Sequence, residues 1–97
     1  MTITKNQNGT AVTLCIAGRL DTITAPELEK EIQLLTEAQS LEIDCKTLEY
    51  ISSAGLRVLL AAHKAFTTKE GMTVTNVQEM LLEIFDVTGF RNILNIK

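Results

Sequence analysis

The chain has 97 residues, 45% of them hydrophobic and 22% charged, which suits one compact globular domain with its own core. Nine basic residues against twelve acidic ones give a formal charge of −3 with no basic cluster, which argues against nucleic acid as a partner. The densest apolar run, Val58–Ala62, is far shorter than the ~20 residues that cross a bilayer, which argues against a membrane anchor.

The amino-terminal segment and the cysteines favour the cytoplasm. The first ten residues, MTITKNQNGT, lack the apolar stretch of a secretory signal. Cys15 and Cys45 form no CxxC pair and have no clustered histidines beside them, so a zinc site is not expected. We expect two reduced, mostly buried cysteines, with a disulfide or redox role as the lesser alternative, and no cofactor.

The chain begins with two predicted strands, over residues 1–7 and 10–18. Asn8-Gly9 between them predicts the positive φ angles of a tight hairpin turn. Gly18 is expected to end the second strand. Apolar residues alternate along that strand, and the ones expected to face the core are Val12, Leu14 and Ile16.

The next segment, residues 19–38, predicts a helix. Thr24 is a good N-cap, Pro26 falls in the first turn, and Glu27 stands three residues after Thr24 as a capping box requires. Its buried stripe is expected to consist of Leu28, Ile32 and Leu35.

The second half of the chain repeats strand and helix. A strand over residues 40–45 should turn Leu41, Ile43 and Cys45 inward and Glu42 and Asp44 outward. The stretch EYISSAGLRVLLAAHKAF, residues 49–66, predicts the second helix, and a fourth strand covers residues 72–77 after Gly71. A third helix over residues 78–89 should end at Gly89, and the tail forms an edge strand or a last helical turn. The apolar period of this helix is carried by Val77, Met80, Leu81, Ile84 and Phe85.

The element order is therefore ββαβαβα. Strand–helix–strand crossovers require parallel pairing and a right-handed path, and the opening hairpin adds one antiparallel edge. We expect an α/β fold: a small mixed β-sheet, mostly parallel with an N-terminal antiparallel hairpin, covered by helices. Residues 1–97 are expected to form one domain.

The sequence offers no active site. His63, the only histidine, follows Ser53 by ten residues on the same predicted helix, about 15 Å away, so no catalytic triad can form. Neither a GxSxG elbow nor a phosphate-binding glycine loop is present. Asp21 and Asp44 each follow an apolar strand segment, where α/β sheets gather functional loops, but nothing beside them indicates a substrate pocket. We do not expect an enzyme.

Ser52 and Ser53 stand at the start of the second helix, and only one of them can be its N-cap. The other hydroxyl is left near the helix tip, where Gly55 would let another molecule approach the backbone. A hydroxyl at this place suits phosphorylation, because free N–H groups and the helix dipole accept an anion. Spacing alone leaves two hypotheses open, a plain cap and a phosphorylation switch. Asp21 and Asp44, if near, would add to the negative field.

The segment LEIDCKTLEYISSAGLRVLL resembles the central segment of STAS domains, the class of the bacterial anti-sigma factor antagonists. The residues that match in order are Asp44, Tyr50-Ile51, Ser53, Ala54 and Gly55-Leu56. The turn GRLD, with Gly18, Leu20 and Asp21 in place, resembles the other marker of the family, and FDVTGF resembles its closing helix and glycine. The resemblance covers nearly the whole chain and implies the STAS fold.

The resemblance also implies a function. It implies a partner-switching module without enzymatic activity that binds an anti-sigma factor/serine protein kinase when unphosphorylated. Phosphorylation on Ser53 would release it, and a metal-dependent serine phosphatase would reset it. Asp21 would shape the loop opposite the start of the second helix. The free protein is expected to be a monomer that exchanges partners. The residues implied for partner binding are Asp21, Thr22, Ser52, Ala54, Gly55, Leu56 and Arg57.

Ser52 is a departure from the family pattern, in which many members carry Asp before the phosphorylated serine. The neutral hydroxyl weakens the local negative charge and makes Ser52 an alternative target. It also favours a second hypothesis, in which the chain is a non-switching structural STAS subunit of a larger signalling or lipid-transport complex.

Overall fold

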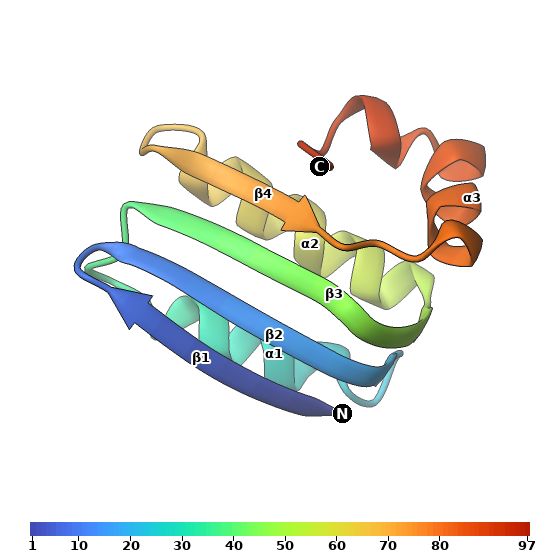
Figure 1. Ribbon diagram of the computed structural model, residues 1–97, viewed down its shortest axis with the longest axis horizontal. Coiled ribbons are helices and arrows are strands. Elements are labelled where there is room, and N and C mark those ends of the chain that lie inside the picture. The colour runs from blue at the N-terminus through green and yellow to red at the C-terminus, as the bar shows by residue number, and fades with distance from the viewer.

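The computed structural model describes every residue from Met1 to Lys97 (Figure 1). The elements in chain order are β1 (Thr2–Asn8), β2 (Ala11–Leu20), α1 (Ala25–Gln33), β3 (Ser40–Ile51), α2 (Ser53–Phe66), β4 (Gly71–Thr75), α3 (Glu79–Thr88) and the 3-10 helix η1 (Phe90–Asn92). This is the predicted order ββαβαβα.

The four strands form one mixed sheet in the order β1-β2-β3-β4. β1 pairs with β2 antiparallel, whereas β2–β3 and β3–β4 are parallel, so the predicted topology is confirmed. Helices α1 and α2 lie behind the sheet in Figure 1, and α3 lies at the end toward which β4 points. The carboxyl ends of the parallel strands and the amino terminus of α2 therefore share one end of the molecule.

The core lies between the sheet and the helices, and the predicted alternation of the strands places it. The inward residues of β2 and β3 are at most 2% exposed, as predicted: Val12, Leu14, Ile16, Leu41, Ile43 and Cys45. Of the stripe predicted for the first helix, Leu28 is buried and Ile32 packs partly buried against the core, whereas Leu35 is buried beyond the end of α1 at Gln33. Burial of these side chains supplies the main stabilisation of the fold.

The hairpin turn differs from its prediction. Only Gly9 has a positive φ, of 64°; Asn8 is the last residue of β1 and pairs with Ala11. Gly18 does not end its strand either, because β2 continues to Leu20 and Gly18 lies at a register shift with φ 93°. A bulge at a glycine lets the strand bend and continue, and the hydrophobic period does not reveal it.

One further boundary and one predicted cap were wrong. β3 extends to Ile51, so Glu49 and Tyr50 belong to this strand and not to the second helix. The predicted capping box at Thr24 is absent: Thr24 is the N-cap of α1, but its side chain makes no capping hydrogen bond.

The carboxyl-terminal part combines both alternatives given for the tail. α3 ends at Gly89, whose φ of 79° confirms the predicted C-cap. Leu81 and Phe85 are buried as predicted, but Met80 is 65% exposed, since it lies on the side of α3 away from the core. After η1 the chain returns to the sheet and forms a parallel bridge between Val74 and Ile96.

Candidate functional site

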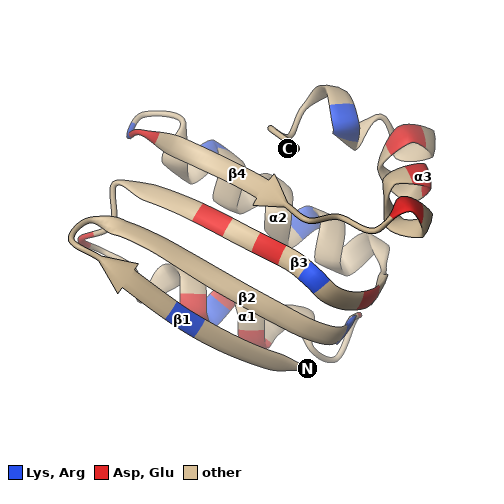
Figure 2. Cartoon of the chain, viewed as in Figure 1, with Lys and Arg blue, Asp and Glu red and all other residues tan.

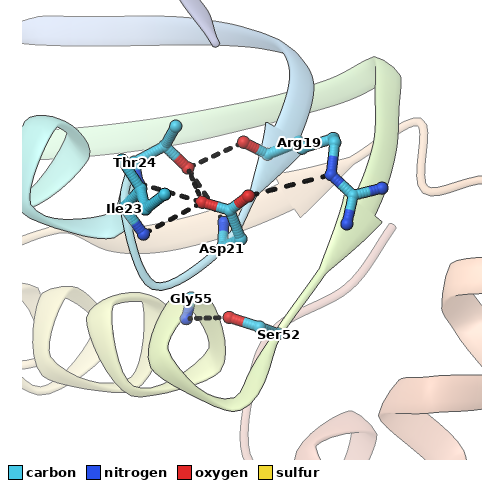
Figure 3. A network of polar contacts seen from close by, with 6 residues as sticks. All are labelled: Arg19, Asp21, Ile23, Thr24, Ser52 and Gly55. Carbon is cyan, nitrogen blue, oxygen red and sulfur yellow. Dashed lines mark hydrogen bonds and ion pairs between the residues drawn. The ribbon is translucent and has the colours of Figure 1, made fainter.

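Two loops meet at the carboxyl ends of β2 and β3. Leu20 and Ile51 are register partners at these ends, and the backbone N–H of Ser52 donates to the Leu20 carbonyl at 2.9 Å. Asp21 and Ser52, the next residues of the two chains, are thereby brought together although 31 positions separate them in the sequence. Figure 3 shows this pair of loops with the start of α2 below.

Ser52 is the N-cap of α2. It has an extended backbone (φ −101°, ψ 176°), and its Oγ accepts a hydrogen bond from the Gly55 N–H at 3.5 Å (Figure 3). Ser53 is the first residue of the helix, is exposed, and its side chain takes part in no hydrogen bond. The expectation that one hydroxyl caps the helix and the other is left at the tip is therefore confirmed.

The structure gives a different reason for a glycine at position 55 from the one predicted. It is buried, and a Cβ at this position would lie 2.7 Å from Leu20 Cγ and 2.9 Å from Ile51 Cγ1. The missing side chain therefore lets α2 pack closely on the ends of β2 and β3, and does not open the backbone to another molecule. Leu56 is buried too, at 5% exposure. Neither residue is available for direct contact with a partner in this conformation.

Asp21 organises the loop between β2 and α1. Its Oδ1 accepts the N–H groups of Ile23 at 3.0 Å and Thr24 at 3.1 Å. The hydroxyl of Thr24 accepts the Asp21 N–H at 2.8 Å and donates to the Arg19 carbonyl at 2.7 Å. Thr24 thus serves this loop, which explains why it does not cap α1. The Thr24 N–H, followed by that of Ile23, holds the pKa of the Asp21 carboxyl below its ordinary value.

Arg19 and Tyr50 complete this end of the sheet, and the sequence reasoning singled out neither side chain for a role. They are register partners on β2 and β3, and the Arg19 guanidinium lies 4.1 Å from the centre of the Tyr50 ring. Arg19 Nε is also 3.7 Å from Asp21 Oδ2 (Figure 3). A correct register for β2 and β3 would have brought them together, but the bulges in β2 hide that register from the sequence.

The remaining residues of the predicted partner surface lie beside the tip of α2. Thr22 and Arg57 are exposed and Ala54 is half-buried. All three line a shallow hollow of about 380 Å³ between α1 and α2. Arg57 makes no ion pair, although it is a long cation beside this tip.

Asp44 is not part of this site. It lies in the middle of β3, seven residues before the strand ends, which places it about 20 Å from the tip of α2. Its carboxylate accepts hydrogen bonds from Asn76 Nδ2 and the Lys46 N–H, both at 3.0 Å. The bond from Asn76 is the main reason that the pKa of Asp44 is lowered. The expectation that Asp44 follows a strand segment is therefore wrong, and the condition that it lie near the serines is not met.

The other chemically notable side chains lie elsewhere. His63 is half-buried on α2, with Nδ1 enclosed and without a hydrogen-bond partner. Both cysteines are free; Cys45 is buried and Cys15 half-buried. No group of three or more His, Cys, Asp or Glu side chains is placed to hold a metal ion. None of the helices has the length and apolarity that a bilayer span requires. Figure 2 shows Lys and Arg scattered over several elements.

A family model described as "Mlab, STAS domain" matches residues 3–95. The chain belongs to the STAS domain family. The family and fold that the sequence motifs implied are thereby confirmed.

Relatives of this STAS domain are anti-sigma factor antagonists. The anti-sigma-B factor antagonist of Bacillus subtilis is 34% identical over 92 residues, which cover 93% of this chain and 84% of the relative. A crystal structure of an anti-sigma factor antagonist from Mycobacterium paratuberculosis superposes with a TM-score of 0.87 at 23% identity, covering 98% of this chain and 83% of that one. The antagonist SpoIIAA in its unphosphorylated form superposes at 0.76 with 12% identity, over 99% of this chain and 87% of that one. The chain is thus a homologue of anti-sigma factor antagonists.

Proposed function

We propose that this STAS domain is an anti-sigma factor antagonist that switches partners through phosphorylation of Ser53. In the unmodified state it binds an anti-sigma factor that is also a serine kinase; phosphorylation releases it, and a metal-dependent serine phosphatase restores it. The observation that carries the proposal is the exposed, unbonded hydroxyl of Ser53 at the first residue of α2. Sequence similarity to the anti-sigma-B factor antagonist supports the same role.

The contrast between the two serines supports Ser53 as the target. The Ser52 hydroxyl is half-buried and engaged with the Gly55 N–H, so a kinase would have to break the helix cap to reach it. Ser53 needs no such opening. Ser52 stays the alternative target, and the two make opposite predictions for single substitutions.

The chemistry of the step is simple. The kinase supplies ATP; the Ser53 oxygen forms a bond to the γ-phosphorus, its proton is lost to the kinase active site, and ADP leaves. The product carries nearly two negative charges at neutral pH. Free N–H groups and the dipole at the start of α2 favour this charge, so the fold should persist. The two forms of SpoIIAA support this point, since the unphosphorylated and phosphorylated structures superpose on this chain equally, with a TM-score of 0.76.

Release then follows from a change at the docking edge, which we define as Thr22, Ser53, Ala54 and Arg57. Thr22, Ala54 and Arg57 are accessible members of the predicted partner surface, and Ser53 is the exposed phosphorylation site beside them. Ser52, a further predicted member, is half-buried. Asp21 stays a member through the loop that it holds in shape. A partner surface that fits closely against this edge would meet a new bulky anion after phosphorylation. The domain would act in the cytoplasm, as one domain and a monomer when free.

The test is an intact-mass measurement after incubation with ATP and each anti-sigma factor kinase encoded by the source genome. We expect one added phosphate on the wild type and on Ser52→Ala, and none on Ser53→Ala. Ser52→Ala loses the N-cap bond and should be the less stable variant, so a loss of folding would remove the phosphate from Ser52→Ala and not from Ser53→Ala. A phosphate retained on Ser53→Ala but absent from Ser52→Ala would move the switch to Ser52.

A second candidate function is a structural STAS subunit of a larger complex. It is favoured by Ser52, which replaces the aspartate that many switching members carry, and by the family model, whose description names Mlab. Absence of phosphate with every kinase, together with stoichiometric co-purification with transport or signalling subunits that survives Ser53→Asp, would establish this second function.

A further inference from the structure

Arg57 is a free cation one helical turn after Ser53. It is exposed and follows Ser53 by four residues on α2. The chain contains two ion pairs, Arg19–Asp21 and Arg91–Asp86, and Arg57 belongs to neither. It makes no hydrogen bond, so nothing in the unmodified protein holds its guanidinium.

Helix geometry brings Arg57 to the Ser53 hydroxyl. Residues four apart on a helix are neighbours, with Cβ atoms ≈ 5–6 Å apart. Side chains lean toward the helix amino terminus, so a long side chain covers the turn before its own Cα. The guanidinium of Arg57, which lines the hollow between α1 and α2 in the unmodified protein, can therefore reach a phosphate on Ser53 by turning back along the helix. An anion placed before a cation at this spacing is also the favourable orientation.

Arg19, another cation at this end of the molecule, already has partners. Arg19 lies over the Tyr50 ring and beside the Asp21 carboxylate. The first turn of α2 contains no acidic residue, and Glu29 of α1, the carboxylate that lines the same hollow as Arg57, forms no ion pair with it. A phosphate on Ser53 would thus find one guanidinium close by and uncommitted.

We propose that Arg57 binds the phosphate of phosphorylated Ser53 and is thereby withdrawn from the docking edge. The inference rests on the proposed function in taking Ser53 as the modified residue. Phosphorylation then changes the partner surface twice: it adds a bulky anion, and it turns a cation that faced the partner back along its own helix. The position of the Arg57 side chain thus depends on whether Ser53 is phosphorylated.

The pairing can be tested without any kinase. Phosphoserine is incorporated at position 53 during translation, and the second pKa of its phosphate is measured by ³¹P NMR titration. An i,i+4 ion pair should lower this pKa by about 0.2–0.4 unit relative to Arg57→Gln, and Arg57→Lys should keep part of the shift. Lys64→Gln, which removes an exposed cation near the other end of α2, should leave the pKa at the wild-type value.

Two results would overturn the pairing. One is an equal phosphate pKa in wild type and Arg57→Gln, which would leave the helix N–H groups as the sole support of the phosphate. The other is a pKa that rises in Arg19→Gln but not in Arg57→Gln, which would assign the phosphate to Arg19. Backbone amide spectra of each variant show whether the fold is kept, and Arg57→Lys provides a second reading if Arg57→Gln is perturbed.

The withdrawal from the docking edge has its own readout. Unphosphorylated Arg57→Gln should bind the kinase several-fold more weakly than wild type, whereas Lys64→Gln should bind equally. Wild-type affinity in Arg57→Gln would overturn this part of the inference. If no kinase phosphorylates Ser53 but the ³¹P shift depends on Arg57, the proposed function fails while the pairing holds. If Ser53 is phosphorylated but the shift does not depend on Arg57, the pairing fails alone.

Discussion

The guanidinium of Arg19 lies over the ring of Tyr50, 4.1 Å from its centre. This contact joins the carboxyl-terminal ends of β2 and β3 on the outer face of the sheet. The same guanidinium is 3.7 Å from Asp21. The contact therefore connects the end of the sheet to the loop that begins at Asp21.

A double-mutant cycle should reveal this contact. At a partly exposed site a cation–π pair contributes about 0.5–1 kcal/mol. Arg19→Gln and Tyr50→Leu should each lower the free energy of unfolding measured with urea, and the double variant should lose less than the sum of the two. Strict additivity would show that the two side chains do not interact in solution.

The two serines should differ in what they contribute to stability. Ser52→Ala removes the N-cap bond of α2 and should cost about 0.5–1 kcal/mol, the lower part of the usual range, because the bond is long at 3.5 Å. Ser53→Ala removes an exposed hydroxyl without a partner and should change stability little. Urea melts of the two variants compare these costs; an equal loss in both would mean that Ser53 shares the cap.

Gly55 should resist enlargement. A methyl group there would press on Leu20 Cγ and Ile51 Cγ1, both within a closely packed core. We expect Gly55→Ala to lower the free energy of unfolding by about 1–2 kcal/mol, since overpacking outweighs the better helix propensity of alanine. Gly9→Ala, which would meet no neighbouring atom but has a positive φ, separates backbone strain from overpacking. A Gly55→Ala variant as stable as wild type would show that Leu20 can move aside.

Asp21 should make stability depend on acid pH. Hydrogen bonds from Thr24 and Ile23 lower its pKa in the folded state, so the ionised form is favoured by folding. This stabilisation is complete above the unfolded pKa of about 3.9 and is lost as pH falls through the lower folded value. The urea midpoint of wild type should therefore fall more steeply below about pH 4 than that of Asp21→Asn. Parallel pH profiles for the two proteins would contradict this.

The two thiols should react in order of burial. Burial raises the pKa of Cys45 to about 12, and burial together with Asp44 raises that of Cys15. Because the thiolate is the reactive form, a disulfide reagent at pH 8 should modify Cys15 slowly and Cys45 only on unfolding. Cys15→Ser should remove the slow phase. Fast modification of Cys45 in the native protein would show that the core opens readily.

The sequence carried enough information to predict the fold because its strands follow a clear period. Val12, Leu14 and Ile16 alternate with smaller residues, and this alternation fixes which face of β2 is buried. The ends of the strands were harder to predict. The bulge at Gly18 and the long β3 depend on pairing between β2 and β3, which no local pattern encodes.

At the site too, features that depend on local sequence could be predicted, and features that depend on tertiary contacts could not. The capping role of one serine and the freedom of the other follow from helix chemistry and could be predicted. The burial of Gly55 could not, because it depends on Leu20 and Ile51 arriving from two different strands. Thr24 was assigned to the wrong hydrogen bonds, since its tertiary partners, the Asp21 N–H and the Arg19 carbonyl, compete with the local cap.

The return of the tail to β4 decides which border of the sheet is open to other chains. The Val74 N–H donates to the Asn95 carbonyl and the Lys97 N–H to the Val74 carbonyl, both at 2.9 Å. These bonds occupy backbone groups that a foreign strand would otherwise use to join β4 and seed aggregation. The outer border of β1 has no such cover, and Lys5 at its centre is the kind of residue that discourages strand addition there. Shortening the carboxyl terminus would therefore expose the edge of β4, a strand that contains no lysine to discourage strand addition.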